Sequence, residues 1–176
     1  DKPNSDNKQR ALMTAQLLNL GALNDVVVNQ QPYPFFVIEQ SLMMDKVDAI
    51  MQDFPTISEG GSFTLDDLKP GPTFDALIEE LNGPEFRQLI SAKLGLDLSV
   101  LPMIVTLRGY SREKDGRVHT DSTSKIATIL IYFNEKWTAQ GGKLRILASD
   151  NMQDSVAEVI PDAGTMLGFK VTEDCW

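Results

Sequence analysis

The sequence predicts an α+β domain in which helices pack on a β-sandwich or jelly roll. Its first half carries apolar residues at helical spacing, whereas short strand-like runs separated by Gly, Asp and Asn turns follow Leu98. A chain of 176 residues is long enough for one domain with a sizeable core and too short for two. We therefore expect one domain over residues 1–176, with a helix-rich part at 1–97 and a β-rich core at 98–176.

The helix-rich part is punctuated by residues that typically begin or end helices. Ser41 is expected to cap a helix, and Pro84 and Gly95 are expected to mark the start and end of another. Pro34, near the start of an aromatic run, favours an edge strand. The predicted helices cover residues 8–23, 41–53, 72–82 and 84–94, and the predicted edge strand covers residues 33–38.

The segment 55–72 is predicted to be a long surface loop, because it contains several Gly and Pro residues and few apolar ones. Loops of this kind often cover functional sites. The segment is therefore a candidate lid, and a passive connection would fit the pattern equally well.

The β-rich part begins after Leu98. Its run 126–133 is nearly continuous in apolar residues, so both of its faces should be covered and we expect a central strand. The predicted strands cover residues 102–110, 125–133, 143–148, 156–160 and 165–169.

Charge and cysteine content restrict the partners and the compartment. The chain has 16 Lys and Arg against 25 Asp and Glu, a net charge of −9, so we expect neither nucleic acid nor a membrane surface as a partner. Cys175 is the single cysteine and cannot form an internal disulfide, which is typical of a cytoplasmic protein. No apolar run approaches the roughly 20 residues of a membrane span.

One pair of residues carries the chemistry. His119 is the only histidine, and Asp121 lies two positions beyond it. On an extended strand such residues point to the same side, about 7 Å apart, so an imidazole and a carboxylate can bind one ion. The pair is two thirds of the 2-His-1-carboxylate triad that holds Fe(II). An exposed ion pair beside a turn would have the same spacing, so the pair alone leaves both interpretations open.

Further motifs follow this pair in a characteristic order. A strand ends in Tyr132-Phe133-Asn134 with Trp137 beyond it, and a Gly-Gly-Lys-Leu turn and a Pro-Asp-Ala-Gly turn come later. This order resembles the Fe(II) and 2-oxoglutarate dependent dioxygenases, specifically their prolyl-hydroxylase-like branch. The resemblance covers residues 102–176 and implies a double-stranded β-helix, that is, a jelly-roll core with the helices packed on it.

The resemblance also implies roles for individual residues. His119 and Asp121 match the catalytic iron ligands of the family, and the Tyr132 hydroxyl matches a donor to the distal carboxylate of 2-oxoglutarate. Other matched residues would line the cosubstrate pocket; they are Leu130, Leu144 and, by a looser match, Tyr110. Ordinary core packing is the alternative for Tyr132 and the two leucines. Arg145 is interpreted as a structural ion-pair partner and not as a group that contacts the substrate.

The resemblance is incomplete at the C-terminus. In the family, a second iron histidine follows the strand after the Pro-x-x-Gly turn, and a basic residue beyond it pairs with 2-oxoglutarate. The sequence ends at Trp176, before either position. We expect the natural chain to continue and to supply both residues and the last strands. A degenerate relative that has lost its metal is the alternative.

The implied function is a 2-oxoglutarate and Fe(II) dependent oxygenase that hydroxylates an unactivated C–H bond. Its cofactor and cosubstrate would be Fe(II) and 2-oxoglutarate, with ascorbate as an additional reductant. A non-catalytic jelly-roll binding module is the alternative function. The substrate, a small molecule or a peptidyl group, does not follow from the fold, and neither does the oligomeric state.

Overall fold

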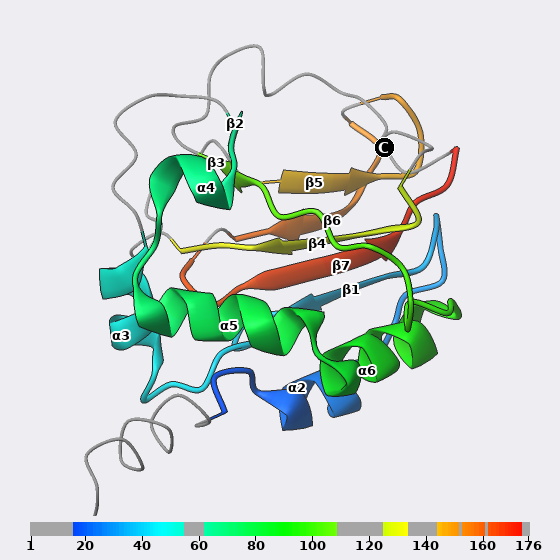
Figure 1. Cartoon of the computed structure of the whole chain (residues 1–176). Coiled ribbons are helices and arrows are strands. Elements are labelled where there is room, and N and C mark those ends of the chain that lie inside the picture. Colours follow the sequence, from blue (N-terminus) through cyan, green and yellow to red (C-terminus); the bar gives the residue numbers. More distant parts are fainter. Residues whose placement is uncertain are drawn as a thin grey trace, which may run out of the picture.

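The computed structural model describes residues 16–54, 62–108, 125–133, 144–151, 153–160 and 162–173. It contains helices and antiparallel strands, consistent with the predicted α+β class (Figure 1). The helices are α2 (Leu20–Asp25), α3 (Val47–Asp53), α4 (Leu65–Leu68), α5 (Pro72–Asn82) and α6 (Pro84–Leu94). The strands are β1 (Phe35–Ile38), β2 (Ser62–Phe63), β3 (Leu107–Arg108), β4 (Ala127–Ile131), β5 (Leu144–Leu147), β6 (Ser155–Val159) and β7 (Met166–Lys170).

The described strands pair in three antiparallel groups. A three-stranded sheet has the order β1-β7-β4, while β2 pairs with β3 and β5 pairs with β6. β1 lies at the edge of the three-stranded sheet and begins directly after Pro34, which confirms the predicted edge strand. The expected central position of β4 is wrong for the described strands, because β7 occupies the centre and pairs on both sides.

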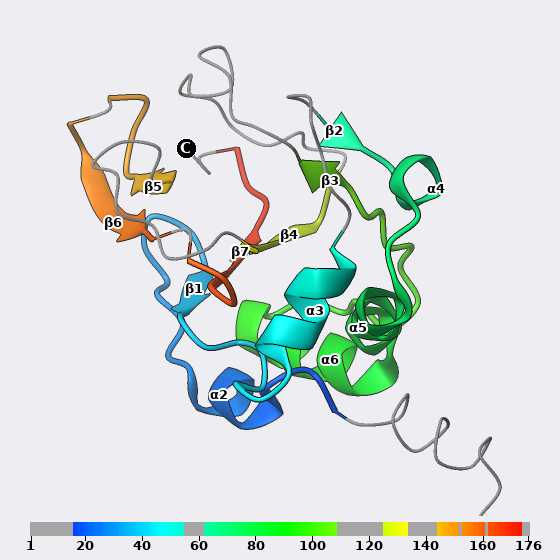
Figure 2. The same ribbon diagram turned by 90° about the vertical axis from the view of Figure 1, so that its left-hand side faces the viewer.

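The three-stranded sheet lies between the helices and the β5–β6 hairpin (Figure 2). Along β4, Ala127, Ile129 and Ile131 pack against the core on the helix side, whereas Leu130 packs on the hairpin side. Successive strand residues face opposite sides of a sheet. Both faces of this nearly continuous apolar run are therefore covered by other parts of the chain, as its composition predicts.

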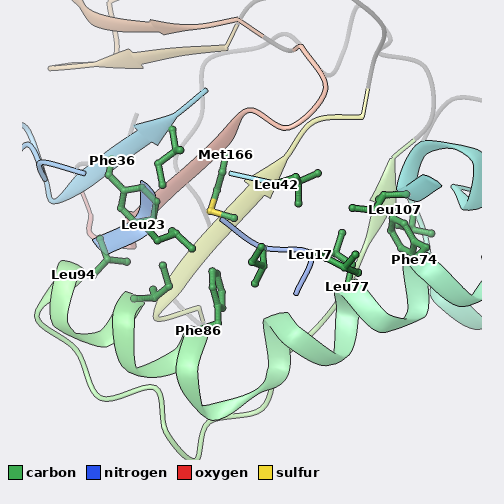
Figure 3. Packing of buried hydrophobic residues seen from close by; sticks show 14 residues of the cluster. Leu17, Leu23, Phe36, Leu42, Phe74, Leu77, Phe86, Leu94, Leu107 and Met166 are labelled. Atoms are coloured by element: carbon green, nitrogen blue, oxygen red, sulfur yellow. The ribbon is translucent and has the colours of Figure 1, made fainter. Parts of the chain in front are cut away.

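The core on the helix side is the larger of the two apolar clusters. Figure 3 shows Phe36 of β1 and Met166 of β7 facing Phe86 and Leu94 of α6. Burial of each such side chain contributes about 1.5–3 kcal/mol relative to exposure. This contact attaches the helical half of the chain to the sheet.

The ends of α5 and α6 agree with the prediction. Each helix starts at a proline, and Gly95 caps the end of α6 with a φ of 66°, the left-handed conformation that glycine adopts readily. The Asp53 carboxylate accepts a hydrogen bond from the Thr73 backbone N–H at 2.5 Å. The end of α3 thereby satisfies an unpaired donor in the first turn of α5.

Two predicted helices start later than expected. In the segment 8–23, residues 1–15 lie outside the described part, and helix α2 begins only at Leu20. Before it, Leu18 forms an antiparallel bridge with Leu42. The Glu80 carboxylate of α5 accepts the backbone N–H groups of Leu17 and Leu18 at 2.9–3.2 Å, which holds this segment extended.

The second late start concerns Ser41, which does not cap a helix. Helix α3 begins at Val47 instead. The Ser41 hydroxyl donates to the Gly164 carbonyl at 2.6 Å, and its backbone N–H donates to the same oxygen at 3.0 Å. The Ser41 hydroxyl, which the local sequence pattern predicts to cap a helix, is thus hydrogen-bonded to a residue 123 positions away in the sequence.

The predicted loop 55–72 is partly ordered into short elements. Residues 55–61 lie outside the described part, while β2 and α4 follow them. Thr64 and Asp67 form a reciprocal capping box at the start of α4. No helix within the described ranges has the length and apolar character of a membrane span.

Candidate functional site

The proposed iron ligands His119 and Asp121 lie outside the residues that the structure describes, as does Tyr110. Within the described part, no group of three His, Cys, Asp or Glu side chains could hold a metal ion. The structure therefore describes the site through its remaining predicted members, Tyr132, Leu130 and Leu144.

These three residues meet in one apolar cluster between the three-stranded sheet and the β5–β6 hairpin. Leu130 lies on β4, Tyr132 follows that strand, and Leu144 begins β5. They are partly buried and pack against a fully buried set, Tyr33, Phe35, Ile146, Val159, Leu167 and Phe169. We call these nine residues the inter-sheet cluster. The structure thus brings together the three predicted pocket residues that it describes.

The backbone of Tyr132 is held by the turn that precedes β7. Its N–H donates to the Thr165 carbonyl at 3.0 Å, and its carbonyl accepts from the Gly164 N–H at 2.8 Å. Gly164 has a φ of 89°, which favours glycine at this position. The glycine of the Pro-Asp-Ala-Gly motif therefore helps to fix the position of Tyr132.

The Tyr132 hydroxyl lies in a partly desolvated environment with a cation in reach. Burial raises the pKa of Tyr132 above its ordinary value of 10.0, and the Arg108 charge opposes this by lowering the pKa. A phenol with a raised pKa is protonated at neutral pH. It can therefore donate a hydrogen bond to a ligand oxygen.

Arg145 does not belong to this arrangement. Its Nε lies 3.3 Å from a carboxylate oxygen of Glu158, the residue opposite it in the β5–β6 register. Both side chains are close to half exposed, so this ion pair contributes less than about 1 kcal/mol to stability. The interpretation of Arg145 as a structural ion-pair partner is confirmed.

The segment that contains the predicted site residues also matches a known protein family. Residues 105–175 match the family model of the 2OG-Fe(II) oxygenase superfamily. The match covers less than half of the sequence and includes every predicted site residue. It supports a 2OG-Fe(II) oxygenase domain in this part of the chain, and that superfamily implies Fe(II) and 2-oxoglutarate. No curated protein matches the chain.

The described residues fit 2-oxoglutarate by their chemistry. The cosubstrate has two carboxylates joined through an apolar linker and a keto group. Leu130 and Leu144 would offer apolar surface to the linker, and the Tyr132 phenol would offer a hydrogen-bond donor to a carboxylate. Sequence analysis leaves Arg108 without a role. In the structure its charge reaches Tyr132, whose pKa it lowers, and no sequence signal links these two positions.

Proposed function

We propose that this protein is a prolyl-hydroxylase-like, Fe(II) and 2-oxoglutarate dependent oxygenase that hydroxylates an unactivated C–H bond of a small-molecule or peptidyl substrate. The coarser assignment to the oxygenase superfamily rests on the family match at residues 105–175. The finer assignment rests on the order of motifs that connects His119 to Tyr132 and to the Gly-Gly-Lys-Leu turn.

The observation that carries the proposal is the convergence of Tyr132, Leu130 and Leu144 in the inter-sheet cluster. These positions were selected by their resemblance to a cosubstrate pocket. They are 14 positions apart at most in the sequence and lie on different sheets. A sheet packed on a hairpin over a shared apolar cluster is also the layer arrangement that a double-stranded β-helix requires.

Each side chain has a defined task in this proposal. His119 and Asp121 supply a nitrogen and an oxygen ligand, a donor set that suits Fe(II). Tyr132 donates a hydrogen bond from its phenolic hydroxyl to a carboxylate of 2-oxoglutarate, and the leucines exclude water around the linker. When bound, Fe(II) supplies the O₂ activation that oxidises 2-oxoglutarate to succinate and CO₂ while one oxygen atom enters the substrate C–H bond.

The decisive test is oxygen-dependent succinate release by the full natural protein with ferrous iron, compared with the His119→Ala variant. We expect release by the wild type and none by the variant. Equal release by both would remove His119 from the mechanism.

A non-catalytic binding module with the same scaffold is separated from the oxygenase by a thermal-shift series with Mn²⁺ and 2-oxoglutarate. A ligand that binds only the folded state raises the melting temperature by mass action. An oxygenase is stabilised by the two ligands together and loses this stabilisation with His119→Ala. A module without a metal site would give the same melting temperatures with and without Mn²⁺.

A further inference from the structure

Gly164 connects Tyr132 to a serine that lies outside the segment matched by the oxygenase family. The Gly164 backbone N–H donates to the Tyr132 carbonyl at 2.8 Å. The Gly164 carbonyl accepts the Ser41 hydroxyl at 2.6 Å and the Ser41 backbone N–H at 3.0 Å. Because the family match covers residues 105–175, Ser41 belongs to the part of the chain that the match does not include. Hydrogen bonds through one glycine thus join that part to the tyrosine of the proposed site.

Ser41 is itself held in place by the segment before α2. Its carbonyl accepts the Asn19 backbone N–H at 2.8 Å, and the Asn19 side-chain amide donates to the Gln40 carbonyl at 3.1 Å. Leu42, the next residue, is 1% exposed and forms an antiparallel bridge with Leu18. Ser41 has no exposed surface. A buried serine with neighbours fixed in this way is a rigid point to which the turn before β7 can attach.

The turn that contains Gly164 benefits from such an attachment. It is closed locally by the Thr165 N–H, which donates to the Asp162 carbonyl at 3.0 Å. Gly164 has a φ of 89°, and glycine adopts positive and negative φ angles about equally readily. A Cβ at Gly164 would meet the Glu39 carbonyl oxygen only at 3.8 Å, so side-chain packing does not select this conformation. The two donors of Ser41 on the Gly164 carbonyl favour it.

The same turn determines where the Tyr132 side chain points. The β4–β7 pairing ends at Ile131 and Met166, and Tyr132 is the next residue. Its N–H donates to the Thr165 carbonyl at 3.0 Å, and its carbonyl accepts the Gly164 N–H. The direction of a side chain follows the conformation of its own backbone. A displaced turn would therefore rotate the phenol within the inter-sheet cluster, and a hydrogen bond weakens steeply when its angle departs from linearity.

We propose that Ser41 is a positioning residue for Tyr132. Through the Gly164 carbonyl it fixes the turn before β7, and this turn fixes the Tyr132 backbone, so that the phenol meets a ligand carboxylate with the geometry of a hydrogen bond. Ser41 acts through Tyr132 and contacts neither ligand nor iron. This inference rests on the proposed function in taking 2-oxoglutarate as the ligand of Tyr132. It extends the oxygenase site to a residue outside the family match.

The first experiment measures hydrogen exchange at the backbone amides of Tyr132 and Gly164 in the full natural protein without ligand. We expect Ser41→Ala to raise both exchange rates about three- to tenfold relative to the amides within β4. Ile90→Val is the matched control. Ile90 is buried on α6, and the loss of one buried methyl group lowers stability about as much as the loss of one hydrogen bond. Equal exchange rates at the two amides in both variants would overturn the proposal.

The second experiment measures the dissociation constant of 2-oxoglutarate with Mn²⁺ in place of iron and without oxygen, so that no turnover occurs. We expect Ser41→Ala to weaken binding about three- to tenfold and Ile90→Val to leave it unchanged. In the Tyr132→Phe background, Ser41→Ala should cause no further loss, because the hydroxyl that Ser41 positions is gone. The same loss with and without the tyrosine hydroxyl would show that Ser41 does not act through Tyr132, and would refute the positioning role.

These measurements distinguish the failure of this inference from the failure of the proposed function. A wild-type protein that does not bind 2-oxoglutarate would refute the proposed function, and faster exchange at Tyr132 and Gly164 in Ser41→Ala would still support the positioning role. A protein that binds 2-oxoglutarate equally well with and without the Ser41 hydroxyl would retain the oxygenase and refute the inference.

Discussion

Gly168 lies directly beneath the ring of Phe36. The two residues are opposite each other in the β1–β7 register, and a Cβ on Gly168 would lie 2.5 Å from Cε1 of Phe36. It would also lie 3.0 Å from Cδ1 of Ile129 on β4. Phe36 has no exposed surface, so its ring cannot move aside without displacing the core. The central strand of the sheet therefore depends on a residue without a side chain.

We expect Gly168→Ala to destabilise the fold by about 1–3 kcal/mol, the usual cost of overpacking a filled core. Chemical denaturation of the variant and the wild type measures this difference. Gly21→Ala is the matched control, because a Cβ there meets only Asn19 Oδ1 at 3.6 Å and alanine favours helix. A Gly168→Ala protein as stable as the wild type would show that Phe36 does not cover this position.

Ser41→Ala removes the buried hydroxyl that joins the segment after β1 to the turn before β7. The Gly164 carbonyl keeps the Ser41 backbone N–H as a donor, so no acceptor is left unpaired. We expect a loss of about 0.5–1.5 kcal/mol, read as a lower melting temperature. The exposed Ser155 hydroxyl, 3.4 Å from the Ala157 carbonyl, provides the control substitution Ser155→Ala, which should leave the melting temperature unchanged.

Glu80→Gln weakens the attachment of the segment before α2. The carboxylate accepts the N–H groups of Leu17 and Leu18, and an amide has only one oxygen to replace two. We expect faster hydrogen exchange at these two amides and a loss of about 1–2 kcal/mol. Glu79→Gln on the exposed side of the same helix should change neither. Equal exchange rates in both variants would contradict the assigned role of Glu80.

Tyr132→Phe should change how stability depends on alkaline pH. Burial raises the pKa of Tyr132 in the folded state above 10.0, its ordinary value. The folded state therefore holds the proton more tightly than the unfolded state. The resulting stabilisation is complete below the unfolded pKa and is lost as pH rises through the folded pKa. We expect the free energy of unfolding to fall less steeply above about pH 10 in the variant. Parallel curves for the two proteins would show that Tyr132 is not desolvated.

Much of the fold follows from local pattern. Proline and glycine at the ends of α5 and α6 predict these helices to within a residue, because both residues act through their own backbone conformations. Alternation and apolar content likewise predict the strands on either side of the inter-sheet cluster. The candidate pocket residues Tyr132, Leu130 and Leu144 come from motif order; all three pack against one buried cluster, and their role in a pocket stays a prediction.

The failures of local pattern have tertiary causes. Ser41 has the composition of a helix cap, yet a carbonyl of the distant turn before β7 binds its hydroxyl. Leu17 and Leu18 continue a helical stripe, yet the Glu80 carboxylate takes their N–H groups and α2 starts later. Sequence spacing contains no information about such partners.

The amino-acid order was sufficient for the class of fold and for the ends of α5 and α6, since these depend on neighbours along the chain. Pairing of β7 with two strands was needed to identify the centre of the sheet, and the distant partners of Ser41 and Glu80 were needed to explain the late starts of α3 and α2. Both depend on contacts between segments far apart in sequence, whose free energy is realised only when the whole chain has folded.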